Sequence, residues 1–128
     1  MPRAKELKVR VEDRPGMLGE IAAALGEKKV NIRGVNGWGE SGEGVIRLIV
    51  DKVPVAKKVL KAHGWTPEEQ DVLEIELSDK PGALGAVAAK LGAAGINISH
   101  AFAGPGGARK VTVFLGVADF KAAAKALR

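Results

Sequence analysis

The sequence predicts an α+β fold made of two similar units, each an antiparallel sheet with helices on one face. Three observations support this prediction: an internal repeat that covers most of the 128 residues, stretches of alternating apolar and polar residues that are typical of strands, and intervening stretches with apolar residues at helical spacing. The units are predicted to span residues 1–71 and 72–128.

The repeat is clearest at one glycine-containing segment. Asp13–Gly19 (DRPGMLG) reappears 66 residues later as Asp79–Gly85 (DKPGALG), and 11 of the 25 positions in 9–33 are identical to those in 75–99. A complete second copy would run past residue 128, so the second copy lacks its end.

The periodicity places the elements of each copy in turn. Apolar residues alternate in 7–12 and 73–77, and helical spacing follows each Asp-x-Pro-Gly turn, where the Asp is expected to cap the helix. Glycine-rich hairpins are expected to connect the second and third strands. The other expected elements are strands beginning at Val30 and Ile96, strands 45–50, 66–72 and 111–117, and helices 53–63 and 119–127.

The resulting order is β-α-β-β-α-β followed by β-α-β-β-α. This is the ferredoxin-like arrangement, with helices on one face of an antiparallel sheet and with the last strand of the second unit missing. A unit of about 60 residues is marginal alone, so the two copies are expected to associate.

The Asp-x-Pro-Gly-x-Leu turn, the helix after it and the (Val/Ile)-Asn-Ile entry to the next strand resemble the ACT domain. The two copies of this pattern together cover nearly the whole chain. The chain therefore resembles small proteins made of two ACT domains without a catalytic domain. This resemblance implies a regulatory module whose amino acid ligand lies between the first loop of one domain and the second strand of its neighbour. The residues so marked are Asp13, Arg14, Pro15, Gly16, Met17, Leu18, Asn31, Ile32 and Arg33, and Asp79, Lys80, Pro81, Gly82, Ala83, Leu84, Asn97, Ile98, Ser99 and His100.

The chemistry of these residues fits a zwitterion. Free N–H groups at a helix N-terminus attract a carboxylate, a loop Asp can pair with an ammonium group, and an Asn side chain offers both a donor and an acceptor. Structural roles are the alternative: Asp13 and Asp79 as helix caps only, and Asn31 and Asn97 as strand-entry residues. Gly19 and its repeat partner Gly85 are expected to mark a close backbone approach, either to the sheet or to a ligand, with packing on the sheet favoured.

Enzyme chemistry finds little support in the sequence. There is no Cys, and His63 and His100 are the only histidines, so no nucleophile-base pair is recognisable. Gly104–Gly107 lacks the Lys-Ser/Thr of a phosphate loop. No catalytic residue, metal site or cofactor is predicted, and His100 is retained as a ligand contact.

The net charge of +5 and the pI near 9.6 raise nucleic acid as a partner. The charge divides into +2 for 1–71 and +3 for 72–128, there is no Tyr, and strands 7–12 and 45–50 carry no aromatic residue on which a base could stack. The charge is therefore interpreted as general surface charge. With no signal peptide or membrane span in the sequence, a soluble cytoplasmic protein without a membrane or nucleic-acid partner is expected.

The predicted function is a non-catalytic regulatory module that binds a small amino acid or related carboxylate at an interface between domains or subunits. The alternative is a ligand-free module that regulates a partner enzyme by contact, and RNA binding is the third possibility. A homodimer is expected, because the missing strand would leave a sheet edge that needs cover. Lys8 and Arg10 could also pair with Glu74 and Glu76 across two sheets or two chains.

Overall fold

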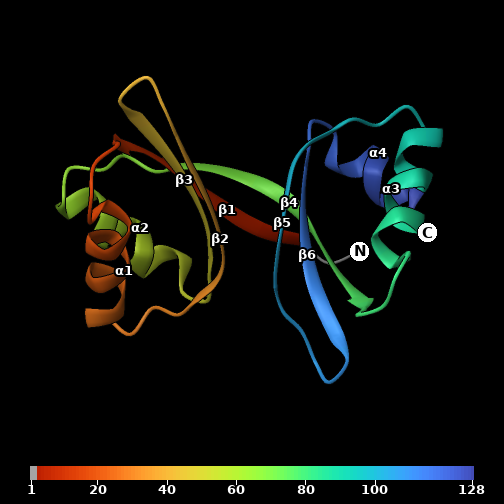
Figure 1. Ribbon diagram of the computed structural model, residues 1–128, viewed down its shortest axis with the longest axis horizontal. Helices are drawn as coiled ribbons and strands as arrows, with labels where there is room; N and C mark the ends of the chain where they lie inside the picture. The colour runs from red at the N-terminus through yellow and green to blue at the C-terminus, as the bar shows by residue number, and fades with distance from the viewer. Residues whose placement is uncertain (1–2) are drawn as a thin grey trace. The chain divides into compact units, whose positions relative to one another are not determined.

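The computed structural model describes residues 3–128 and contains both predicted copies (Figure 1). Among these residues no helix has the length and apolar character needed to cross a membrane. The elements in chain order are β1 (Arg3–Glu12), α1 (Met17–Glu27), β2 (Ile32–Glu40), β3 (Glu43–Val50), α2 (Val53–Ala62), β4 (Glu68–Ser78), α3 (Ala83–Ala93), β5 (Ile98–Pro105), β6 (Lys110–Val117) and α4 (Phe120–Ala126).

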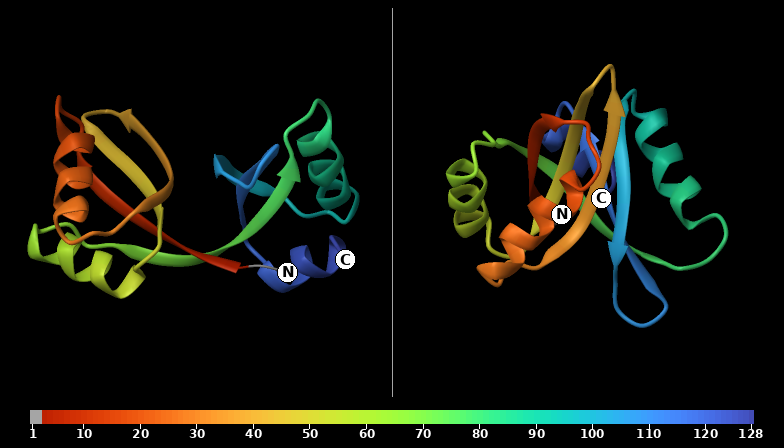
Figure 2. Two further views of the ribbon diagram at one scale, coloured as in Figure 1. Left: turned by 90° about the horizontal axis from the view of Figure 1, so that it is seen from below. Right: turned by 60° about the vertical axis from the view of Figure 1, so that its left-hand side comes forward.

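The six strands have the order β2-β3-β1-β4-β6-β5. The chain divides into two compact units: Lys5–Gln70, here called the N-terminal unit, and Asp71–Arg128 with Arg3 and Ala4, here called the C-terminal unit. In each unit the third strand pairs antiparallel with both the first and the second, and two helices cover one face of these strands (Figure 2). The predicted α+β fold with two βαββαβ-like units is confirmed.

The core of the N-terminal unit follows the predicted alternation. Leu7, Val9 and Val11 of β1 turn toward the helices and are fully or almost fully buried. They pack with alternate residues of β3 and with apolar residues that recur along α1 and α2. The helix residues in this cluster are Met17, Ile21, Ala24, Leu25, Ala56, Val59 and Leu60.

The C-terminal unit has a smaller fully buried core. Leu73 of β4 packs with Val113 and Leu115 of β6, and Leu91 is the buried residue of α3. Because α3 is rich in Ala and Gly, it buries fewer large side chains against its sheet than α1 does. Half-buried residues such as Ile75 complete this core.

β4 differs from the prediction in an informative way. The two expected strands 66–72 and 73–77 form one continuous strand, Glu68–Ser78, which belongs at its start to the N-terminal unit and then to the C-terminal unit. The second copy ends in helix α4, as predicted. The expectation of a bare sheet edge is wrong, because β1 lies next to β4 and its residues Arg3 and Ala4 belong to the C-terminal unit.

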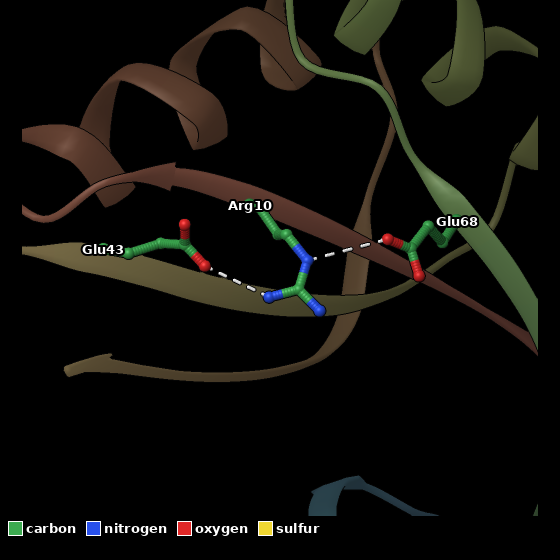
Figure 3. Close-up of polar contacts among 3 residues, drawn as sticks. All are labelled: Arg10, Glu43 and Glu68. Atoms are coloured by element: carbon green, nitrogen blue, oxygen red, sulfur yellow. Dashed lines mark hydrogen bonds and ion pairs between the residues drawn. The ribbon is translucent and has the colours of Figure 1, made fainter. Parts of the chain in front are cut away.

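The helix-free face of the N-terminal unit carries an exposed charge cluster (Figure 3). Arg10 of β1 places Nη1 3.1 Å from Glu43 Oε1 of β3 and Nε 3.7 Å from Glu68 Oε1 of β4. Arg10 therefore has two acidic partners within its own unit, so it does not need Glu74 or Glu76. All three side chains are more than half exposed, and such ion pairs add little stability.

Candidate functional site

The loop between the first strand and the first helix has the same geometry in both copies. Gly16 (φ 85°) and Gly82 (φ 87°) occupy the N-cap positions in the left-handed conformation, and no side chain caps either helix. Only glycine adopts this conformation without strain. The expectation that Asp13 and Asp79 cap the helices is therefore wrong, because each Asp lies three residues before the cap.

Both Asp residues tie this loop to the neighbouring hairpin through their backbone. The N–H of Asp13 donates to the carbonyl of Gly42 at 3.1 Å, and the N–H of Asp79 donates to that of Arg109 at 2.9 Å. The carboxylate of Asp13 lies directly on Gly39 of β2, where a Cβ would overlap it. The Asp13 side chain is thus free of helix capping and faces the end of β2.

The first turn of each helix leaves amide groups without acceptors. The N–H of Met17 donates to Arg14 and that of Glu20 donates to Gly16, whereas the N–H groups of Leu18 and Gly19 have no backbone acceptor within residues 3–128. Leu84 and Gly85 repeat this in the second copy. Such amides, at the positive end of a helix dipole, form an anion-binding position.

The sequence suggested close backbone packing at Gly19 and Gly85, but the structure shows none there. A Cβ built on either residue meets no other atom within 4 Å, and both residues are exposed. Backbone packing therefore gives no reason for a glycine at these positions. Their amides, by contrast, are open to a ligand.

A cavity of about 420 Å³ lies in front of the first loop of the N-terminal unit. Its walls come from the end of β1, the loop, the first turn of α1, and the facing parts of β2 and β3. This volume is within the range of small-molecule sites. The lining residues are Val11, Glu12, Asp13, Arg14, Gly16, Met17, Leu18, Gly19, Val35, Gly37, Trp38, Gly39, Gly44 and Ile46.

Trp38, which the sequence analysis did not single out, is oriented by a buried ion pair. The guanidinium of Arg47 lies 4.7 Å from the indole centroid, and its Nε is 3.2 Å from Glu6 Oε1. Glu6 is 1% exposed, while Trp38 is 45% exposed. A large aromatic side chain at the surface is uncommon. In the sequence, the signal for Trp38 was its position within a glycine-rich segment.

Arg14 of the loop is already engaged. Its Nη2 donates to Glu20 Oε2 at 2.7 Å, and its Nε lies 3.6 Å from Glu12 Oε2. The hydrogen bond and charge of Glu20 raise the pKa of Arg14, which stays charged. In the second copy, Lys80 takes the place of Arg14 and Ala86 that of Glu20. Lys80 therefore has no carboxylate in the position that Glu20 occupies beside Arg14.

Asn31 and Ile32 are not part of this cavity. The N–H of Asn31 donates to Asp51 Oδ1 at 2.9 Å, and the N–H of Asp51 donates to the Asn31 carbonyl at 3.1 Å. Because β2 runs parallel to β1, with β3 antiparallel between them, Asn31 lies at the opposite end of the unit from the loop. Within one unit, the structure brings the loop together with Val35–Gly39 instead.

In the C-terminal unit, His100 packs on the sheet. Its ring covers Gly116 so closely that a Cβ there would overlap it, and Ser99 Oγ lies 2.9 Å from its Nδ1. It also stacks on Phe102, whose ring contacts Phe114 at 5.3 Å. These three rings are adjacent, yet Phe114 is buried and offers no face to a base.

The remaining predicted residues of this unit keep the positions of their repeat partners. Ala83 and Leu84 begin α3, and Leu84 is half exposed like Leu18. Pro81 is exposed in the loop, and Asn97 is exposed just before β5, with Ile98 half-buried at its start.

Within residues 3–128 no cluster of three or more His, Asp or Glu side chains could hold a metal ion.

Comparison with known families agrees with the repeat. Residues 5–64 and 72–128 each match the ACT domain. The chain belongs to the ACT domain family. It contains two ACT domains in tandem, and no curated protein matches it closely.

Solved structures of similar fold match nearly the whole chain. Protein BT0572 from Bacteroides thetaiotaomicron is 25% identical with a TM-score of 0.88, over 98% of this chain and 86% of that chain. The regulatory subunit of aspartate kinase from Thermus thermophilus is 15% identical with a TM-score of 0.68, over 98% and 89%. That from Thermus flavus is 16% identical with a TM-score of 0.63, over 98% and 90%. In fold, the chain thus resembles protein BT0572 and these aspartate kinase regulatory subunits.

Proposed function

We propose that this ACT module binds a small amino acid, or a related carboxylate, in the cavity of the N-terminal unit. The main support is that one cavity contains both groups that suit an anion and a group that suits a cation. The free amides of Leu18 and Gly19 suit a carboxylate, and the Asp13 carboxylate suits an ammonium group. Apolar lining residues such as Met17 and Val35 would accommodate the side chain.

The loop of the C-terminal unit repeats the amides and the Asp, but its strand lacks the large side chains. Alignment at the shift of 66 puts Ala101 where β2 has Val35 and Gly104 where it has Trp38. We therefore expect the first copy to bind more tightly. Asn31, Ile32, Asn97, Ile98 and His100 stay candidates only for a ligand shared with a neighbouring domain or subunit.

The output of binding would be a change in how domains or subunits pack. Leu18, Val35 and Trp38 surround the cavity and are 50%, 42% and 45% exposed. An apolar rim of this kind is typical of a surface that a partner covers. A ligand that binds one packing arrangement more tightly than another shifts the equilibrium toward it.

A thermal-shift screen against the twenty amino acids tests this proposal. A ligand present at 100 times its Kd should add about 2.7 kcal/mol of stability, which raises the Tm by several degrees. Asp13→Asn should abolish the shift, because it removes the charge that pairs with the ammonium group. Glu27→Gln removes a charge from the exposed far end of α1 and should leave the shift unchanged.

The alternative outcomes are distinct. If no amino acid raises the Tm, the ligand-free interaction module becomes the better interpretation, and the apolar rim becomes its contact surface. If both variants lose the shift equally, general charge rather than the cavity is responsible. Either result would contradict the amino acid site.

A further inference from the structure

A second cavity lies in the C-terminal unit, between α4 and the start of β1. It has a volume of about 470 Å³. We call it the α4 groove. Of its six lining residues four are cations and none is acidic: Arg3, Phe120, Lys121, Ala124, Lys125 and Arg128.

The cations on α4 and just after it form one row. Lys121, Lys125 and Arg128 are separated by four and three residues, the spacing of neighbours on a helix face. Within residues 3–128 none of the three pairs with an acidic side chain. Like charges four residues apart destabilise a helix, and a lysine in the first turn also opposes the helix dipole.

Local acids do not relieve this repulsion. Asp119 is used as the N-cap of α4, accepting a hydrogen bond from the Ala122 N–H at 3.0 Å. Asp71, which is not among the lining residues, has its Oδ2 3.6 Å from Nη1 of Arg3. The lysine row therefore has an unmatched positive charge that an external anion would neutralise.

Arg3 gives the groove a fixed wall. Its guanidinium lies 4.5 Å above the ring of Phe120 and also contacts Asp71. The half-buried Phe120 and Ala124 add apolar surface beside the cations. The groove thus combines an apolar floor with a row of positive charges.

We propose that the α4 groove docks an acidic segment of a partner protein. Carboxylates of the segment would contact Lys121, Lys125 and Arg128, and an apolar side chain would lie on Ala124. A single-stranded nucleic acid fits less well, because base stacking needs an open aromatic face and Arg3 covers that of Phe120. This surface is separate from the proposed amino acid site, whose residues belong to the other unit.

Fluorescence anisotropy with a short labelled peptide of alternating Glu and Leu tests the proposal on the full chain. The same peptide with Gln in place of Glu measures the contribution of charge. The Glu peptide should bind, and added salt should weaken its binding. The Gln peptide should bind at least about tenfold more weakly, a difference of 1.4 kcal/mol.

Two charge-matched double variants show where the peptide binds. Lys121→Glu/Lys125→Glu should weaken binding at least tenfold, whereas Lys58→Glu/Lys90→Glu, at exposed helix positions elsewhere, should change it less than twofold. Lys121→Gln/Lys125→Gln covers the case in which the first variant misfolds, and circular dichroism checks each fold. Absence of peptide binding, equal losses in the two reversal variants, or tighter binding of a single-stranded oligonucleotide would each overturn the proposal.

Discussion

At the scale of single residues, a buried ion pair lies against the indole of Trp38, one of the residues that line the cavity. Glu6 and Arg47 are 1% and 13% exposed at the side chain, so both are largely removed from water. Burying one charge without its partner is strongly unfavourable. Arg47 in turn stacks on Trp38, so this pair links the buried strands β1 and β3 to the rim of the proposed amino acid site.

Removing one member of this pair should destabilise the protein strongly. Glu6→Ala leaves the Arg47 charge buried, and we expect a loss of about 3–5 kcal/mol in the free energy of unfolding, measured by urea denaturation. Glu6→Leu/Arg47→Met removes both charges and should lose much less. If the double variant is as unstable as Glu6→Ala, packing rather than charge explains the loss.

At the scale of elements, the Asp-x-Pro-Gly turn is defined by its glycine. The sequence suggested an Asp cap, which is common, but the chain enters α1 and α3 through left-handed Gly16 and Gly82. Pro and Gly in succession are compatible with either entry, so local sequence does not distinguish them. The Asp side chain is therefore not used as a helix cap in either copy.

Two glycines of the same loop and helix should respond in opposite directions to alanine. Gly16→Ala places a Cβ at φ 85° and should cost about 1–2 kcal/mol. Gly19→Ala lies in open space at a helical position and should stabilise the protein by up to about 1 kcal/mol. Thermal melts measure both changes, and a destabilised Gly19→Ala would show that the space near Gly19 is not free.

The start of β1 should stabilise the C-terminal unit specifically. Ala4 is 7% exposed and belongs to that unit, so Ala4→Asp would bury an unpaired charge there. We expect hydrogen-exchange protection to fall in β6 and α4 but not in β3. Ala23→Asp, at an exposed position of α1, is the control. Equal loss of protection in both units would contradict the assignment of Ala4.

At the scale of the whole molecule, the reason to expect a homodimer changes. The position next to β4 is occupied by β1, while within residues 3–128 β2 and β5 each pair with a strand on one side only. The apolar rim of the cavity, Leu18, Val35 and Trp38, is a second surface that association would cover. We therefore still propose a homodimer, now through the N-terminal unit.

Light scattering at tens of micromolar protein should give the mass of a dimer. Leu18→Asp should shift it toward the monomer, because it places a charge in the rim. Val55→Asp introduces the same charge at an exposed position of α2, outside the rim, and should leave the mass unchanged. A monomeric wild-type protein would refute the dimer.

The sequence by itself determined the duplication, the α+β class and the helix-facing residues of each copy. The apolar periodicity and the repeat at a shift of 66 residues can both be read directly from the amino-acid sequence. It also located both first loops, since Asp-x-Pro-Gly is a turn in any fold.

Only the tertiary structure decided which distant residues meet. It brought Val35–Gly39 rather than Asn31 to the first loop, placed Glu6 beneath Arg47, and put Arg3 against Phe120, more than a hundred residues away. Each of these contacts depends on strand order and register. A one-residue shift in register turns every side chain to the other face, so local patterns cannot predict them.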